Sequence, residues 1–187
     1  MLVIGVAMLQ GSRHEHIHSL QIAAEKLSLN IEIRELRKAE QIEGINGLIL
    51  PGGESTAMKI AGKYEDLFNG LWNYVRANEI PVLGTCAGAI LLSQQNLIST
   101  KIARNAFGRQ IDSFEKNLRL NFPEDLPFHG IFIRAPRFVE DAVNPIAWLE
   151  EEVVGVHENN IIALTFHPEL TSNTIFHEWL ISSANNS

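Results

Sequence analysis

The first half of the chain alternates short runs rich in apolar residues with segments whose apolar residues recur at helical spacing. The short runs lie at residues 2–8, 31–34, 47–50 and 80–83. Helical spacing over residues 17–29 and 64–77 places apolar residues on one face of each segment. The first face carries Ile17, Leu20, Ala24 and Leu27, and the second carries Leu67, Leu71 and either Tyr74 or Val75. Apolar runs of this length are typical of strands buried on both faces of a parallel sheet. Because they alternate with helices, they predict an α/β fold, doubly wound around a mainly parallel sheet with helices on both faces.

The pattern changes beyond Gln95, where the strand signals become short and closely spaced. They predict strands, mostly antiparallel, at residues 106–114, 130–134, 153–157 and 161–166. A surface loop is expected at residues 123–127 and a final helix at residues 174–183. No repeat, low-complexity segment or linker separates the two halves. We therefore expect residues 1–187 to form a single domain, with an antiparallel portion added to the parallel sheet.

Charge, apolar stretches and cysteine content limit the cellular compartment and the kinds of partner that we expect for this protein. The net charge is −7 and no basic cluster occurs, which argues against nucleic acid as the main partner. No apolar stretch reaches membrane-spanning length, and the first strand begins without a basic leader, so we expect a cytoplasmic protein with no membrane partner. The single cysteine excludes an internal disulfide and leaves one thiol for chemistry.

A Gly-x-Cys-x-Gly turn at residues 84–88 is the first candidate for that chemistry. It lies between a predicted strand and a predicted helix, which is the context of a nucleophile elbow. In such a turn Cys86 projects above the sheet, helix N–H groups stabilise a thiolate, and the Ala87 N–H is available to an oxyanion. The alternative is that Cys86 is a small buried hydrophobic residue, the usual state of a free cysteine.

The loop Pro-Gly-Gly-Glu-Ser-Thr at residues 51–56 follows another predicted strand. Because the carboxyl ends of parallel strands open on one side of a sheet, we expect this loop to face the cysteine turn. Gly53 would then offer a second oxyanion N–H, and Glu54 and Ser55 would offer polar groups to a ligand. A Pro-Gly turn before a capped helix is a blander explanation that is compatible with the first.

The third candidate is the His-Pro-Glu sequence that ends the run 161–166. Extended residues two apart point the same way, so Glu169 can hold the imidazole of His167 while the other ring nitrogen faces a nucleophile. A strand-end histidine beside a solvated glutamate is the alternative. Elsewhere, His14 and His18 lie one helical turn apart, but no third ligand is evident nearby and we expect no metal site.

These motifs resemble class I glutamine amidotransferase domains, whose triad is Cys-His-Glu. The cysteine turn, the glycine loop and the His-x-Glu pair are shared across that superfamily. More specific segments resemble the glutaminase subunits of pyridoxal 5'-phosphate synthases, and they lie at residues 9–11, 104–110, 113–115, 132–136 and 166–171. The resemblance covers nearly the whole chain.

The resemblance implies an enzyme that hydrolyses L-glutamine to L-glutamate and ammonia through a glutamyl thioester, without a cofactor. In that mechanism Cys86 is the nucleophile, His167 and Glu169 complete the relay, and the N–H groups of Gly53 and Ala87 hold the oxyanion. The positions that match glutamine-contacting residues are Gly53, Glu54, Ser55, Arg104, Ile133 and Arg134. Arginines suit the carboxylate of such a zwitterion, and a glutamate suits its ammonium.

The resemblance also implies a partner. Ammonia would pass to a separate synthase subunit that builds pyridoxal 5'-phosphate from a pentose phosphate and a triose phosphate. Because free ammonia is lost to water and to protonation, we expect that subunit to cover the mouth of the site, with Gln10 at the interface. Two other functions stay open: a cysteine hydrolase or amidotransferase that serves another acceptor, and a scaffold subunit with a vestigial site.

Overall fold

The structure is a computed structural model that describes residues 1–8, 11–53, 65–103, 113–139 and 142–186. Five parallel strands form one half of its nine-stranded sheet, in the spatial order β2-β1-β3-β4-β11. Their bounds are β1 (Leu2–Ala7), β2 (Ile31–Leu36), β3 (Gly47–Leu50), β4 (Val82–Thr85) and β11 (Ile161–Leu164). The predicted parallel sheet is therefore confirmed.

The other half of the sheet is antiparallel and continues in the order β10-β9-β6-β7. Its strands are β6 (Ser113–Asn121), β7 (Asp125–Ile133), β9 (Pro145–Leu149) and β10 (Glu152–Glu158). A separate two-stranded sheet pairs β5 (Ile102–Ala103) with β8 (Arg137–Phe138). The added antiparallel portion is thus confirmed, and it joins the parallel half through β11, which pairs with β4 on one side and β10 on the other.

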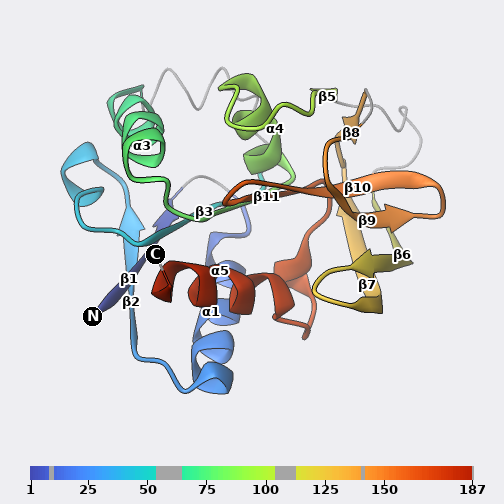
Figure 1. Cartoon of the computed structure of the whole chain (residues 1–187), viewed down its shortest axis with the longest axis horizontal. Coiled ribbons are helices and arrows are strands. Elements are labelled where there is room, and N and C mark those ends of the chain that lie inside the picture. Colours follow the sequence, from blue (N-terminus) through green and yellow to red (C-terminus); the bar gives the residue numbers. More distant parts are fainter. Residues whose placement is uncertain (9–10, 54–64, 104–112, 140–141, 187) are drawn as a thin grey trace.

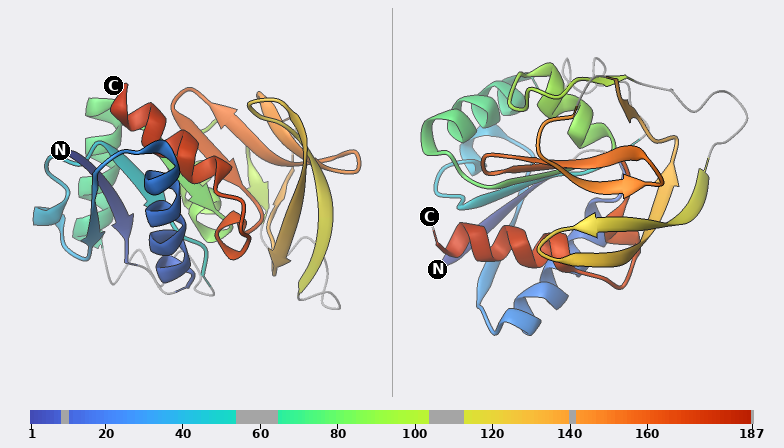
Figure 2. Two further views of the ribbon diagram at one scale, coloured as in Figure 1. Left: turned by 90° about the horizontal axis from the view of Figure 1, so that it is seen from below. Right: turned by 45° about the vertical axis from the view of Figure 1, so that its right-hand side comes forward.

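Helices cover both faces of the parallel half, as Figure 1 shows. On one face lie α3 (Glu65–Asn78) and α4 (Ala87–Gln94), and on the other lie α1 (Arg13–Leu27) and α5 (Ile175–Asn185). Two short 3-10 helices, η1 (Ala39–Gln41) and η2 (Pro168–Leu170), complete the described elements. In Figure 2 the hairpin of β6 and β7 stands at the end of the sheet away from β1 and β2. No helix within the described ranges is long and apolar enough to span a membrane.

Alternating strand residues divide the core into two layers. Val3 packs into the layer under α3, whereas its neighbour Ile4 packs into the layer under α1 and α5. Each helix contributes residues at helical spacing, such as Leu67, Leu71 and Val75 of α3. The central strands are buried on both faces for this reason, and their polar chemistry is confined to the loops at their ends.

The structure corrects two local predictions in the second half. Residues 125–127, predicted as part of a surface loop, belong to β7, where Pro127 pairs with Arg119 of β6. Proline lacks the N–H that an interior strand needs, but β7 lies at the edge of the sheet, where a missing donor is tolerated. Strand β9 was not predicted, because a run of five residues that opens with Pro145 gives a weak strand signal.

Candidate functional site

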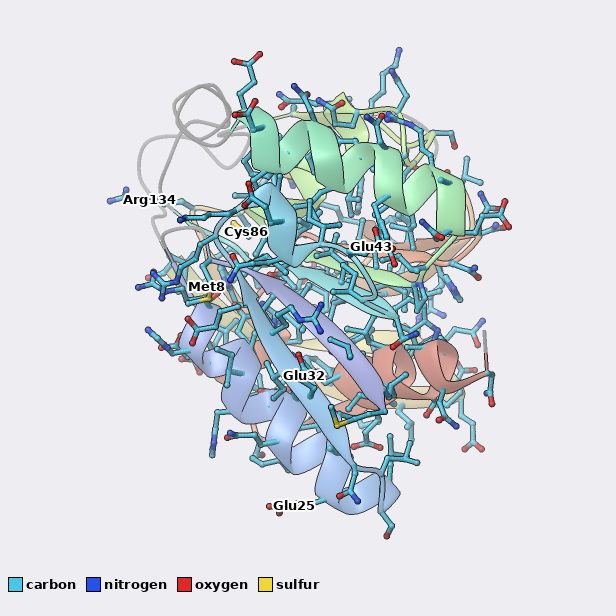
Figure 3. All side chains as sticks on the ribbon, turned by 90° about the vertical axis from the view of Figure 1, so that its left-hand side faces the viewer. Met8, Glu25, Glu32, Glu43, Cys86 and Arg134 are labelled. Atoms are coloured by element: carbon cyan, nitrogen blue, oxygen red, sulfur yellow. The ribbon has the colours of Figure 1, made fainter. Side chains whose placement is uncertain are left out.

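The candidate residues gather at the carboxyl ends of the parallel strands. Cys86 follows β4 directly, and His167 follows the neighbouring strand β11. Gly52 follows β3, which pairs with β4 on its other side. Figure 3 labels Met8, which follows β1, and shows it toward the same end of the molecule as Cys86 and Arg134. The expectation that the loop after β3 faces the cysteine turn therefore agrees with the topology.

Cys86 occupies a strained turn at the N-terminus of α4. Its backbone angles are φ 47° and ψ −106°, a region that residues with side chains seldom adopt. The turn is held from below, because the Cys86 N–H donates to the carbonyl of Leu164 at 2.8 Å. A Cβ on Gly88 would lie 1.9 Å from the carbonyl oxygen of Leu50, so only glycine lets the helix pack this closely on β3. The geometry is that of a nucleophile elbow.

His167 and Glu169 form a hydrogen-bonded pair beside this turn. Nδ1 of His167 lies 2.7 Å from Oε1 of Glu169, and the two side chains are almost completely buried. The His167 N–H donates to the carbonyl of Ile131 at 2.8 Å, which ties this segment to β7. Ser12, just before α1, also donates its hydroxyl to Oε1 of Glu169.

Burial and these contacts act in opposite directions on the two ionisable groups. Burial lowers the pKa of His167, but hydrogen bonds with Cys86 and Glu169 and the attraction of both groups outweigh it and raise the pKa to about 10. Burial raises the pKa of Glu169, but His16, His167 and Ser12 lower it to about 2. At neutral pH the pair is therefore an imidazolium beside a carboxylate.

Gly52 lies against both members of the Cys86–His167 pair. A Cβ on this glycine would lie 2.5 Å from Cε1 of His167 and 3.0 Å from Cβ of Cys86. Its N–H donates to Oγ1 of Thr85 at 3.1 Å. The absence of a side chain thus gives room for the imidazole to approach the thiol.

Six other predicted residues divide into two groups. Ile133 contributes its backbone: the thiol of Cys86 lies 3.9 Å from the Ile133 carbonyl oxygen, in a weak hydrogen bond. Arg134 follows with a positive φ of 45°, which marks a second strained backbone at the rim. Four predicted residues lie outside the described residues, namely Gln10, Glu54, Ser55 and Arg104.

A buried polar cluster behind Glu169 was not predicted from the sequence. It consists of His16 on α1, Thr85 on β4 and His177 on α5, each with a relative exposure of 2% or less. The sequence signal was present, since His16 lies four residues before Leu20 on the buried stripe of α1. His14 and His18 instead face outward, and no group of metal-ligating side chains occurs among the described residues.

The sequence matches a family model over residues 6–186, and that model describes the SNO glutamine amidotransferase family. Among curated relatives, the chain is 46% identical to the pyridoxal 5'-phosphate synthase subunit PdxT of Thermococcus gammatolerans, with 98% of this chain and 100% of the relative covered. It is 45% identical to PdxT of Pyrococcus horikoshii, with 95% and 97% covered.

Solved structures agree with this similarity. A crystal structure of a glutamine amidotransferase matches with a TM-score of 0.81 at 36% identity, covering 97% of this chain and 98% of the other. The structure of PurLQS from Thermotoga maritima matches with a TM-score of 0.73 at 16% identity, covering 99% and 98%, which shows a common fold.

Proposed function

Because the chain belongs to the SNO glutamine amidotransferase family, we propose that it hydrolyses L-glutamine to L-glutamate and ammonia for pyridoxal 5'-phosphate synthesis. The observation that carries this proposal is the convergence of Cys86, His167 and Glu169 at the ends of the neighbouring strands β4 and β11. A thiol in a strained elbow, a partnered imidazole and a buried carboxylate are the parts that nucleophilic attack on an amide requires.

In the proposed mechanism the Cys86 thiolate attacks the side-chain amide carbon of glutamine. The negative charge that develops on the amide oxygen is held by the N–H groups of Ala87 and Gly53. The hydrogen bond of the neighbouring residue supports Gly53 in this role. Because the Gly52 N–H already donates to Thr85, we assign the N–H of Gly53 to the oxyanion. The His167 imidazolium then protonates the departing ammonia, and water hydrolyses the glutamyl thioester.

Glu169 completes the relay by holding the imidazole and stabilising its positive charge. We propose that Glu54, Ser55, Arg104, Ile133 and Arg134 contact the substrate, with the arginines at its carboxylate and Glu54 at its ammonium. The carbonyl of Ile133 borders the thiol, which supports the inclusion of Ile133 among the substrate-contacting residues.

Replacing Gly52 by alanine is expected to lower kcat by about 10²-fold, because the new methyl group displaces the imidazole from the thiol. Gly70→Ala on α3 is the matched control, since its Cβ would lie 2.8 Å from the movable Cδ1 of Ile42 and in ordinary contact, at 3.8 Å, with Cβ of Ala39. Steady-state ammonia release and the thermal unfolding midpoint should be measured for both variants. A folded Gly52→Ala protein with the wild-type rate would contradict the close approach of the two side chains.

The partner is the second half of the proposal. We propose that the ammonia passes to the synthase subunit of pyridoxal 5'-phosphate synthase, docked over the carboxyl ends of the strands with Gln10 at its interface. Ammonia delivery favours an enzyme that is slow until it is docked, because ammonia released into water is wasted. Two curated relatives named as subunits of that synthase support the choice of partner.

Ammonia release from glutamine, measured with and without the synthase subunit, tests the function. We expect slow hydrolysis by the isolated chain and a higher rate at saturating glutamine after mixing, rather than only a lower KM. Asparagine, one methylene shorter, should not be hydrolysed. Gln10→Glu should weaken the activation and leave the isolated rate measurable. Absence of glutamine hydrolysis under both conditions would refute the proposal.

A further inference from the structure

We propose that His16 and His177 are positioning residues that hold the Glu169 carboxylate in the orientation the relay needs. His16 approaches Oε2 of the carboxylate, whereas His167 bonds to Oε1, and His177 contacts the other side of the His16 ring. Neither His16 nor His177 belongs to the triad. The activity measurement that tests this proposal rests on the proposed function. The contacts that carry the proposal, and a second measurement by alkylation of Cys86, do not depend on glutamine.

A continuous chain of contacts joins these histidines to Glu169. Nε2 of His16 lies 3.4 Å from Oε2 of Glu169 and 3.1 Å from Oγ1 of Thr85. On its other side, Nδ1 of His16 lies 2.9 Å from Nε2 of His177. The exposure of both histidine side chains is zero, so water does not compete for these contacts.

The hydrogen-bonding pattern assigns one tautomer to each ring. If His177 carries its proton on Nε2, it donates to Nδ1 of His16, and its Nδ1 is left as a bare lone pair. Nδ1 of His177 is buried and has no partner among the described residues, which suits a lone pair far better than an N–H. His16 must then carry its own proton on Nε2.

The proton on Nε2 of His16 points at Thr85 and Glu169. Oγ1 of Thr85 accepts the hydrogen bond from this N–H group. The partial positive charge of the same N–H group faces Oε2 of Glu169. That carboxylate oxygen is buried and makes no hydrogen bond with the described residues. With the opposite tautomer, a nitrogen lone pair would face the anionic oxygen and His177 would bury an unpaired N–H. Electrostatics therefore favours the donor arrangement on both counts.

Neutrality of both histidines is part of the role. Burial is the main cause that lowers the pKa of His16, and burial together with the neighbouring His16 lowers that of His177 to about 3. The charged groups that face His16 are Glu169, His167 and Glu15. A cationic His16 would pair with Glu169 and compete with the imidazolium of His167. The N–H group of a neutral His16 instead stabilises the Glu169 carboxylate, and the full negative charge of that carboxylate remains available to His167.

The two oxygens of Glu169 are thus held separately. Oε1 accepts from His167 and from Ser12, whereas Oε2 faces His16. Rotation of the carboxylate would place an oxygen away from one of these donors. His177 prevents the compensating movement of His16, because it fixes the far side of the ring from α5.

Four single variants test the role. His16→Leu removes the donor, His16→Gln keeps an N–H near the position of Nε2, and His177→Leu removes the support. His157→Leu is the matched control, because His157 is a partly buried histidine that contacts Phe122 and Trp179 outside the cluster. Two quantities should be measured for each: kcat and KM for glutamine, and the pH dependence of iodoacetamide alkylation at Cys86, the only cysteine of the chain.

We expect His16→Leu to lower kcat by up to about 10²-fold with little change in KM, because a displaced relay affects the chemical step and not binding. The pH profile of alkylation should also differ from that of the wild type, since a mobile Glu169 no longer holds the His167 imidazole in place beside the thiol. His16→Gln should recover most of both losses, His177→Leu should show a smaller loss, and the control should match the wild type.

A wild-type kcat and a wild-type alkylation profile in folded His16→Leu would overturn the proposal. If His16→Leu does not fold, the other two variants decide. A wild-type kcat and a wild-type alkylation profile in both folded His16→Gln and folded His177→Leu would also overturn the proposal. If the wild type itself fails to hydrolyse glutamine, the proposed function is refuted, while the alkylation profiles still decide whether His16 and His177 position the relay.

Discussion

We expect ammonia release from glutamine to fall by a factor on the order of 10⁴ to 10⁶ when Cys86 is replaced by alanine. The expected loss is this large because alanine removes the thiol that the proposed mechanism uses as its nucleophile. The fold should survive, since alanine keeps the Cβ and the change removes one buried sulfur atom from a turn whose backbone is held by Leu164. Steady-state ammonia assays measure the loss of activity, and the thermal unfolding midpoint shows whether the fold is retained.

Chemical labelling supplies the control for this prediction. Iodoacetamide should add one carbamidomethyl group to the wild-type chain and abolish its activity, because the chain has one cysteine. The Cys86→Ala protein should keep its mass under the same treatment. Ammonia release by this variant at the wild-type rate would show that Cys86 is not the nucleophile.

The second large effect is expected at His167. Replacement by asparagine should lower kcat by about 10²- to 10⁴-fold, because the proton that must reach the departing ammonia loses its carrier. Asparagine keeps a polar group in the space of Nδ1, so the hydrogen bond to Glu169 has a replacement and the protein should stay folded. Single-turnover assays with glutamine isolate this chemical step.

Glu169→Gln provides the comparison and should be less damaging than His167→Asn, since it changes the group that orients the base and leaves the base in place. The loss should still be clear, because an amide NH₂ would face a donor from His167, Ser12 or His16 whichever way it turns. Equal activity in both variants and the wild type would refute the relay.

The parallel half of the fold was predictable because its signals are local. Apolar runs such as residues 47–50 and the turn around Cys86 can each be recognised from a few consecutive residues. Because the carboxyl ends of parallel strands open on one side of the sheet, motifs that follow different strands are expected to meet there. The juxtaposition of Cys86 with the pair His167 and Glu169 followed from that rule, and the structure brings these three side chains together.

The polar cluster behind Glu169 was not predictable in the same way. Helical periodicity placed Ile17 on the inner face of the first helix, where it does pack against the core, but it gave no sign that the adjacent His16 is completely buried. A histidine on an apolar stripe becomes informative only when its partners on other elements are known. Of those partners, Thr85 lies in the cysteine turn at a position to which the sequence assigned no role, and His177 belongs to no motif.

The site joins parts of the chain that are far apart in the sequence. Ser12 and Glu169 are separated by 157 positions, and His16 and His177 by 161. Contacts of such high sequence separation are costly in loop-closure entropy and form slowly compared with local ones. During synthesis on the ribosome, the segment that follows β11 emerges after β4, so the thiol of Cys86 is made well before its imidazole partner. A nascent chain therefore carries a cysteine without its imidazole partner until the segment after β11 has been made and has folded against the sheet.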